Sequence, residues 1–275
     1  MARRSGRVLR TYPNLLILPL LGGIAGIAFV ATLFGALYAG GVYDSGGVAL
    51  YVALFAIYLV ETLVASFFAA ALVAATRAVF HGETPTVTDA MRQAWDHKWP
   101  LLVWSVIAAV VGVLIQAIES QDNIVAELLA GLFAVAWSVI TYFVVPVIVF
   151  EDTSISGMFE ESARTFKNTW GESIGAMGAI NLVTFALVLV GALLGVVTFL
   201  VVPSGAGVAV AIVVGLSGIV LGLLIGKSLT GIAKTALYVY ATEQTAPEFF
   251  EDMDFSKLGG DAGSQASRSG VGSRI

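Results

Sequence analysis

The sequence predicts an all-α integral membrane protein whose six transmembrane helices form three pseudo-repeated helical hairpins, each preceded by a short amphipathic cytoplasmic helix. Composition is the first reason: 58% of the 275 residues are hydrophobic and 12% are charged, whereas soluble folds carry about 25% charged residues. The second reason is that the hydrophobic residues gather into six runs, each near or above the roughly 20 residues that a helix needs to cross a bilayer. The runs are Leu15–Tyr38, Val48–Val79, Leu101–Ile118, Ile124–Phe150, Ile174–Val202 and Val208–Ile225.

Short breaks join these runs in pairs. The segments Ala39–Gly47 and Pro203–Gly207 are rich in glycine and Glu119–Asn123 is polar, as expected of tight turns that close helical hairpins. The first run continues to about 24 residues, too long for a removable signal peptide, and is expected to be a retained anchor. Pro146 near the end of the fourth run is expected to kink that helix, because proline removes a backbone donor.

The lysines and arginines predict the orientation, because cytoplasmic loops retain an excess of them. All 14 lie before the first run, at the second-to-third and fourth-to-fifth connections, or after the sixth run. We therefore expect a multi-pass protein of the cell membrane with its N- and C-termini in the cytoplasm. The three opposite loops and their edges hold no basic residue and four acidic ones, Asp44, Glu119, Asp122 and Glu127.

Two cytoplasmic connections have the pattern of short amphipathic helices that lie in the membrane interface. Thr86–Trp99 opens with threonines typical of helix N-caps, and its apolar residues repeat at helical spacing. Ser154–Trp170 has the same pattern, and Glu160 is placed to pair with Arg164 one turn later. The apolar faces consist of Ala90, Met91, Ala94 and Trp95 in the first segment and of Phe159, Ala163, Phe166 and Trp170 in the second.

The N-terminal segment adds a third copy of this pattern. Ser5–Pro13 aligns with Ser162–Trp170, and the residues around Arg92 fit the same frame, so that Arg7, Arg92 and Arg164 occupy one position. We infer three repeats, each of an amphipathic helix and a hairpin. Because each repeat crosses the membrane twice, successive repeats share one orientation, unlike the inverted repeats of many transporters.

The chain changes character after Pro247. Residues 1–247 are expected to form the six-helix membrane domain. Residues 248–275 begin with an acidic and aromatic segment and continue as a Gly/Ser-rich stretch. We expect them to form a mostly disordered cytoplasmic tail.

Four features of the sequence carry a resemblance to a known family. The first is the basic amphipathic segment before the first run. The others are the end of the fourth run at Val145–Asp152, the Ser-x-Arg-x-Phe-Lys-x-x-Trp pattern that ends at Trp170, and Ala236–Thr242. Over about residues 1–250 the chain resembles uncharacterised haloarchaeal six-span membrane proteins. These are similar to the membrane domain of some glycerophosphoryl diester phosphodiesterases, in which a separate soluble barrel performs the chemistry. The resemblance implies a fold, a location and a halophilic source, but no catalytic residue.

Glu61 is the strongest candidate for a functional residue, because an ionised carboxylate inside an apolar run is costly unless it is paired or protonated. One interpretation is a carboxylate that relays protons or ions in a cavity. The other is a neutral or hydrogen-bonded acid that packs against another helix near Gln116 or Lys227. Gln116 and Asn181 are further intramembrane polar residues, which we expect to form hydrogen bonds between helices.

Five basic residues form a predicted cytoplasmic rim. They either extend to anionic lipid headgroups at the interface or surround a vestibule that attracts an anionic lipid or substrate. Nucleic acid is not an expected partner, because the basic residues are scattered over one membrane face and the net charge is −5. The rim consists of Arg7, Arg92, Arg164, Lys227 and Lys234.

Glycines at helical spacing predict close contacts between helices, because small residues let backbones approach. This packing joins spanning helices within one chain or, alternatively, joins copies in a homo-oligomer. The glycines are Gly191, Gly195, Gly218, Gly222 and Gly226.

The sequence contains no pattern for catalysis, metal binding or cofactor binding. It has no cysteine, no phosphate loop and no dinucleotide glycine motif, and His81 and His97 lack matched carboxylate ligands. We therefore expect no metal, no cofactor and no enzymatic activity. The leading hypothesis is a membrane scaffold or accessory protein that acts through its cytoplasmic face. The alternative is a transporter of a small solute or lipid through the helix-bundle interior, and a membrane enzyme ranks third.

Overall fold

The described part of the chain is helical, as the sequence predicts. The computed structural model describes residues 1–41, 47–121, 123–151, 153–202, 205–243, 247 and 249–251, and these contain no strand. Most of the predicted tail and the loop residues Asp44 and Asp122 lie outside this part. Six helical segments are long and apolar enough to cross a membrane, and they confirm the predicted spans: Pro13–Ala39, Gly47–Phe80, Lys98–Glu119, Ile124–Phe150, Ser173–Val201 and Gly207–Glu243.

The chain forms two compact units. The terminal unit contains Met1–Thr11 and the described residues from Thr165 onward, and the central unit contains Tyr12–Arg164. The division falls within helix α9 (Ile155–Asn168). Each unit is described by itself below.

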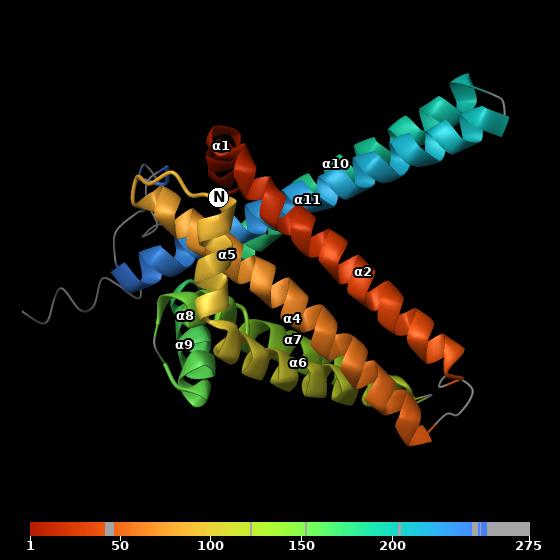
Figure 1. The fold of residues 1–275 in the computed structure, drawn as a ribbon. Helices are drawn as coiled ribbons and strands as arrows, with labels where there is room; N and C mark the ends of the chain where they lie inside the picture. The colour runs from red at the N-terminus through yellow and green to blue at the C-terminus, as the bar shows by residue number, and fades with distance from the viewer. Residues whose placement is uncertain are drawn as a thin grey trace, which may run out of the picture. The chain divides into compact units, whose positions relative to one another are not determined.

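The central unit packs around one long helix, α4 (Gly47–Phe80). Figure 1 shows α6 beside α4, and α7 beside α6. The 3-10 turn η1 (Pro13–Leu16) is tied to the α4–α5 connection, because Asn14 Nδ2 donates a hydrogen bond to the carbonyl of Pro85 at 2.9 Å. The other helices of the unit are α2 (Ile17–Ala39), α5 (Val87–Asp96), α6 (Lys98–Glu119), α7 (Ile124–Ile140) and α8 (Val144–Phe150).

Small residues bring α4 close to its neighbours. The second half of α4 is rich in alanine, and Ala70 and Ala74 are among the buried residues there. On α2, a Cβ added to Gly22 would lie 2.9 Å from the Cβ of Phe68 in α4. Close backbone approach of this kind is typical of packed membrane helices.

The fourth span is broken just before Pro146. Helix α7 ends at Ile140 and α8 begins at Val144, so residues 141–143 form a turn between them. Proline lacks an N–H, and its ring clashes with the carbonyl four residues earlier, which here belongs to Tyr142. The predicted effect of Pro146 is therefore present, and it takes the form of a break about one turn before the proline.

The terminal unit consists of α1 (Ala2–Thr11), α10 (Trp170–Val201) and α11 (Gly205–Glu243). Helices α10 and α11 lie side by side as a long hairpin (Figure 1), and α1 packs on both. Helix α11 continues far beyond Ile225, where the predicted span ends. Lys227 and Lys234 end the hydrophobic run, but lysine favours helix and no proline lies between Ile225 and Glu243, so the backbone remains helical.

The predicted glycines form the contact between α10 and α11. A Cβ added to Gly191 would lie 2.4 Å from the carbonyl carbon of Gly218. One added to Gly195 would lie 2.8 Å from the Cα of Gly215. Only glycine permits backbones this close.

The same contact continues along the hairpin. A Cβ on Gly222 would lie 2.9 Å from the backbone nitrogen of Val188, and Gly226 faces the side chain of Thr184. All the predicted glycines therefore lie at the contact between α10 and α11 within this chain. Gly215 belongs to the contact and was missing from the predicted set.

Candidate functional site

Helix α5 is held against α4 by its cap, a small residue and one aromatic ring. The Oγ1 of Thr86 accepts a hydrogen bond from the backbone N–H of Asp89 at 3.1 Å, which confirms the predicted N-cap. Ala90 is buried, and the ring of Trp95 packs edge-on against Phe67 of α4, with 6.4 Å between the centroids. The apolar side of α5 is thus fixed to the second half of α4.

Helix α9 is anchored at the break in the fourth span. The backbone N–H of Phe143 donates to the buried Oγ of Ser162 at 2.9 Å. One turn earlier, Phe159 packs against Trp104 and Trp137, whose rings are stacked with centroids 5.8 Å apart. A polar bond and an aromatic cluster therefore join α9 to α6, α7 and the turn.

Helix α9 ends earlier than the sequence pattern predicts. Trp170, expected on its apolar face, begins α10 and is exposed. Phe166 is buried and makes an edge contact with the Trp170 ring at 5.2 Å between centroids. The helix stops at Asn168, and a β-branched residue of low helix propensity, Thr169, separates the two helices.

Helix α1 packs on α11 and α10 through Val8 and Leu9, which are buried. The Nη1 of Arg4 donates to the carbonyl oxygen of Phe249 at 3.4 Å. Burial, and secondarily the Arg4 guanidinium, lowers the pKa of the Met1 amino group. A short basic helix is thereby attached to the long hairpin.

The three amphipathic helices share one pattern of burial. Arg7, Arg92 and Arg164 are exposed on α1, α5 and α9. The residue two positions before each arginine is small and buried, and the residue two positions after it is also buried. Burial thus follows the sequence alignment around the arginines. The buried positions are Ser5, Ala90 and Ser162 before them, and Leu9, Ala94 and Phe166 after them.

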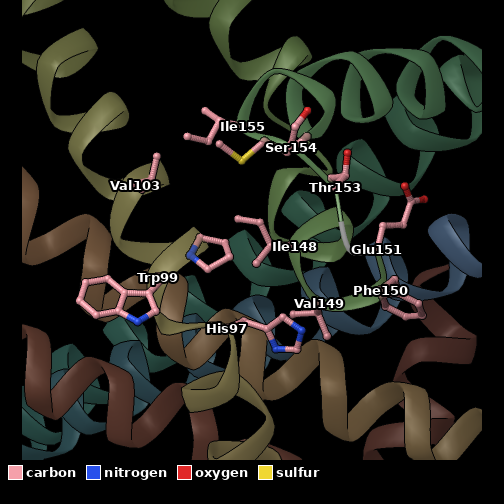
Figure 2. Close-up of a pocket in the computed structure, with 12 residues that line it drawn as sticks. His97, Trp99, Val103, Ile148, Val149, Phe150, Glu151, Thr153, Ser154 and Ile155 are labelled. Carbon is pink, nitrogen blue, oxygen red and sulfur yellow. The ribbon is translucent and has the colours of Figure 1, made fainter.

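A cavity of about 480 Å³ lies in the central unit where α6, α8 and α9 meet the end of α5. Figure 2 shows Val103 of α6, Ile148 of α8 and Ile155 of α9 around this space. Trp99, which also lines the cavity, is 67% exposed. Phe150 lines the cavity as well, and the guanidinium carbon of Arg77 lies 4.5 Å from the centroid of its ring.

His97 connects α5 to α6 and borders this cavity. Its Nδ1 lies 2.8 Å from the carbonyl oxygen of Gln93. A carbonyl only accepts hydrogen bonds, so Nδ1 carries the proton and Nε2 of the neutral ring is an acceptor. His81 makes the same contact with the carbonyl of Arg77, also at 2.8 Å, but does not line the cavity.

A second cavity of about 400 Å³ lies between α4 and α5 and includes Arg92. Glu83, Asp89 and Asp96 line it as well. These three carboxylates make the cavity more negative, which weakens the attraction of Arg92 for anions. The cavity residues are grouped too loosely for a metal site, since no three His, Asp or Glu side chains gather for one among the described residues.

The intramembrane polar candidates have different surroundings. Glu61 is exposed on α4 and lines neither of these cavities. Gln116 of α6 accepts a hydrogen bond from the Tyr58 hydroxyl of α4 at 3.4 Å through Oε1. Asn181 is exposed on α10. Polar contact between spanning helices therefore involves Gln116 and Tyr58, one turn from Glu61.

The five residues of the basic rim are divided between the two units. Arg7, Lys227 and Lys234 belong to the terminal unit, and Arg92 and Arg164 to the central unit. Four are exposed, and Lys234 is partly buried. Arg164 forms its ion pair with Glu161 rather than with the predicted Glu160, three residues rather than four before it. Glu161 is the less exposed of the two acids.

Sequence reasoning missed the cavity at His97. It considered this residue only as a metal ligand, and it did not single out Val103, Ile148 or Thr153. The signal present in the sequence is weak: Trp99 and Pro100 lie at the boundary between an amphipathic segment and an apolar run. Tryptophan at such a boundary is typical of the membrane interface.

Six long apolar helices and short amphipathic helices packed at their ends define a multi-pass α-helical membrane protein. The chain belongs to a family of unknown function, DUF6159, whose model matches residues 48–248. This match includes the second to sixth spanning helices. No curated protein and no solved structure is similar to the chain.

Proposed function

We propose that this chain is a non-enzymatic accessory or scaffold protein of the cell membrane, with both termini in the cytoplasm, which acts through α1, α5 and α9. In this proposal the three helices are equivalent parts of a threefold repeat. The common burial pattern around Arg7, Arg92 and Arg164 supports it.

The observation that carries the proposal is the basic surface of α1. Four arginines lie within this ten-residue helix, and Arg3, Arg7 and Arg10 are exposed while Val8 and Leu9 are buried. A helix fixed by its apolar side presents its cations to the headgroup region. Each basic residue near an anionic membrane surface contributes about 1 kcal/mol. Helix α1 therefore holds anionic lipid headgroups, and α5 and α9 contribute less because three carboxylates line the same cavity as Arg92 and Glu161 pairs with Arg164.

Lipid competition on the full chain tests this part of the proposal. The purified protein is mixed with phosphatidylglycerol and phosphatidylcholine, and bound lipids are counted by native mass spectrometry. Replacing Arg3, Arg7 and Arg10 with Gln is expected to remove most of the preference for phosphatidylglycerol. The matched variant R92Q/R164Q is expected to retain it. Equal preference in the two variants would contradict the role of α1.

Crosslinking in cells tests the accessory role itself. A photoreactive amino acid at Gln93, exposed on α5, is expected to give a discrete crosslinked protein. The same amino acid at Leu128, exposed on the spanning helix α7, is expected to crosslink lipid alone. Crosslinks to lipid alone from both positions would count against an accessory protein.

Transport is the second candidate function. The hydrogen bond between Tyr58 and Gln116, one turn from Glu61, favours it, because polar groups inside spanning helices often mark a pathway. In that case E61Q changes the growth phenotype of the host at normal protein levels, and the α1 arginine variant does not. The accessory protein is expected to show the opposite result.

A further inference from the structure

The cavity bordered by His97 has the size and lining of a small-molecule site. Its volume of about 480 Å³ falls within the range of about 300–1,000 Å³ that such sites occupy. Val103, Ile148 and Met158 provide an apolar wall, and the last two are buried. Figure 2 shows His97 and Thr153 on different sides of Ile148, so polar groups border an apolar interior.

Hydrogen-bonding capacity remains in this lining. The Nδ1–H of His97 donates to Gln93, which leaves Nε2 as an acceptor. Ser154, by contrast, accepts from the backbone N–H of Gly157 at 3.2 Å and so caps α9. His97 Nε2 is therefore a lining atom that can accept a hydrogen bond from a ligand.

The charges of the described lining favour a neutral ligand over an anionic one. Among the described residues that line it, Glu151 is the only charged one, and none is a lysine or arginine. A carboxylate or phosphate would therefore lose its hydration without a cation in return. A neutral hydroxyl group, which can donate to Nε2, meets no such penalty.

The position of the cavity indicates where its ligand comes from. It lies at the start of α6 and the end of α8, which are ends of two membrane-spanning segments. Trp99 is exposed beside it, as expected at the boundary between headgroups and hydrocarbon. Molecules at that depth are the lipids of the bilayer.

We propose that this cavity binds one hydrocarbon chain of a neutral membrane amphiphile, whose hydroxyl group donates a hydrogen bond to Nε2 of His97. The apolar wall from α6, α8 and α9 takes the chain, and the polar edge takes the head. The site uses none of the arginines on which the proposed accessory function rests. It can therefore be tested separately from that function.

Photolabelling tests the site on the full chain in nanodiscs of phosphatidylcholine. The probe is a C16 alcohol with a diazirine near the end of its chain, and labelled peptides are identified by mass spectrometry. Saturable labelling is expected in the segments that contain Val103, Ile148 and Met158. V103W, which fills the cavity, is expected to reduce labelling at least about tenfold, whereas V106W, one turn further on α6 and outside the lining, is expected to retain it.

A histidine pair provides the second comparison. H97L and H81L each remove a histidine that donates to a carbonyl at 2.8 Å, but only His97 lines the cavity. H97L is expected to raise the half-saturating probe concentration about fivefold, the effect of one hydrogen bond, and H81L to leave it unchanged. Replacing Arg3, Arg7 and Arg10 with Gln is expected to have no effect.

Three results would overturn the proposal. The first is labelling that never saturates and is equal in V103W and V106W, as bulk lipid contact would give. The second is an equal loss in H97L and H81L, which decides the matter even where V103W fails to fold. The third is that the fatty acid of the same chain length competes with the probe as strongly as the alcohol does. The proposal predicts weaker competition by the acid, because no lysine or arginine lines the described part of the cavity.

Discussion

Replacing Gly191 with alanine is expected to destabilise the hairpin of α10 and α11. The added Cβ would lie 2.4 Å from the carbonyl carbon of Gly218 and 2.6 Å from the nitrogen of Ile219, well inside the 3.4 Å at which ordinary contact begins. Both atoms belong to the backbone, so no side chain can rotate away. The two helices have to separate by about 1 Å, and their remaining contacts weaken.

The expected magnitude follows from two opposing effects. Overpacking typically costs about 1–3 kcal/mol, and alanine gains up to about 1 kcal/mol over glycine inside a helix. Because the overlap is between backbones, we expect a net loss of about 1–2 kcal/mol in the free energy of unfolding. Gly178, also on α10, has nothing within 4 Å of an added Cβ, so G178A keeps only the gain.

Equilibrium unfolding in mixed micelles, followed by circular dichroism, measures the difference between G191A and G178A. We expect G178A to be more stable by about 2–3 kcal/mol. G218A, on the other side of the same contact, should be non-additive with G191A. Equal stability of G191A and G178A would refute the close approach, and an effect that grows with protein concentration would show that the glycines join copies.

Two further predictions concern topology and a buried hydrogen bond. Because the chain lacks cysteine, a single introduced cysteine reports which side of the membrane its position faces. In intact cells, T88C is expected to be protected from an impermeant maleimide and S120C is expected to be labelled. The reverse pattern would show the opposite orientation. W104F removes the bond that Trp104 Nε1 donates to Ser66 Oγ at 2.9 Å and is expected to lower the free energy of unfolding by about 1–2 kcal/mol. Adding S66A should recover part of this loss in the same titration, and no recovery would contradict the assignment.

The number and positions of the spanning helices could be predicted because hydropathy is a sum over many residues, and single errors do not change it. The end of α11 could not be predicted in this way. Lys227 lowers the mean hydropathy of the residues around it, but it breaks no backbone hydrogen bond of the helix. The break at residues 141–143 is an intermediate case. Pro146 indicates a perturbation there, but its consequence depends on what the freed backbone meets.

The candidate site is harder to predict for a related reason. Val103 and Ile148 are far apart in the sequence, and the cavity between them exists because of the turn before Pro146 and the way α9 packs there. No periodicity within one helix records such a meeting. Gly215 illustrates the opposite case, since it lies three residues before Gly218 and a search for spacings of three as well as four would have found it.

Ser5 and Ser162 provide a final test of the equivalence of α1 and α9. They occupy the same position relative to Arg7 and Arg164, and both are fully buried. Ser162 accepts the N–H of Phe143, whereas the Ser5 hydroxyl has no hydrogen-bond partner in the described part of the chain.

The two serines should therefore respond oppositely to alanine. S162A removes the acceptor of a buried N–H and is expected to lower the free energy of unfolding by about 1–3 kcal/mol. S5A removes a buried hydroxyl that has no bond and places a better helix former in α1, so it is expected to be neutral or to stabilise by about 0.5 kcal/mol. A loss in S5A as large as that in S162A, measured in the same micelle titration, would mean that both serines act as hydrogen-bonded anchors. Helices α1 and α9 would then be equivalent in the hydrogen bonds of Ser5 and Ser162, and not only in the size and burial of these two residues.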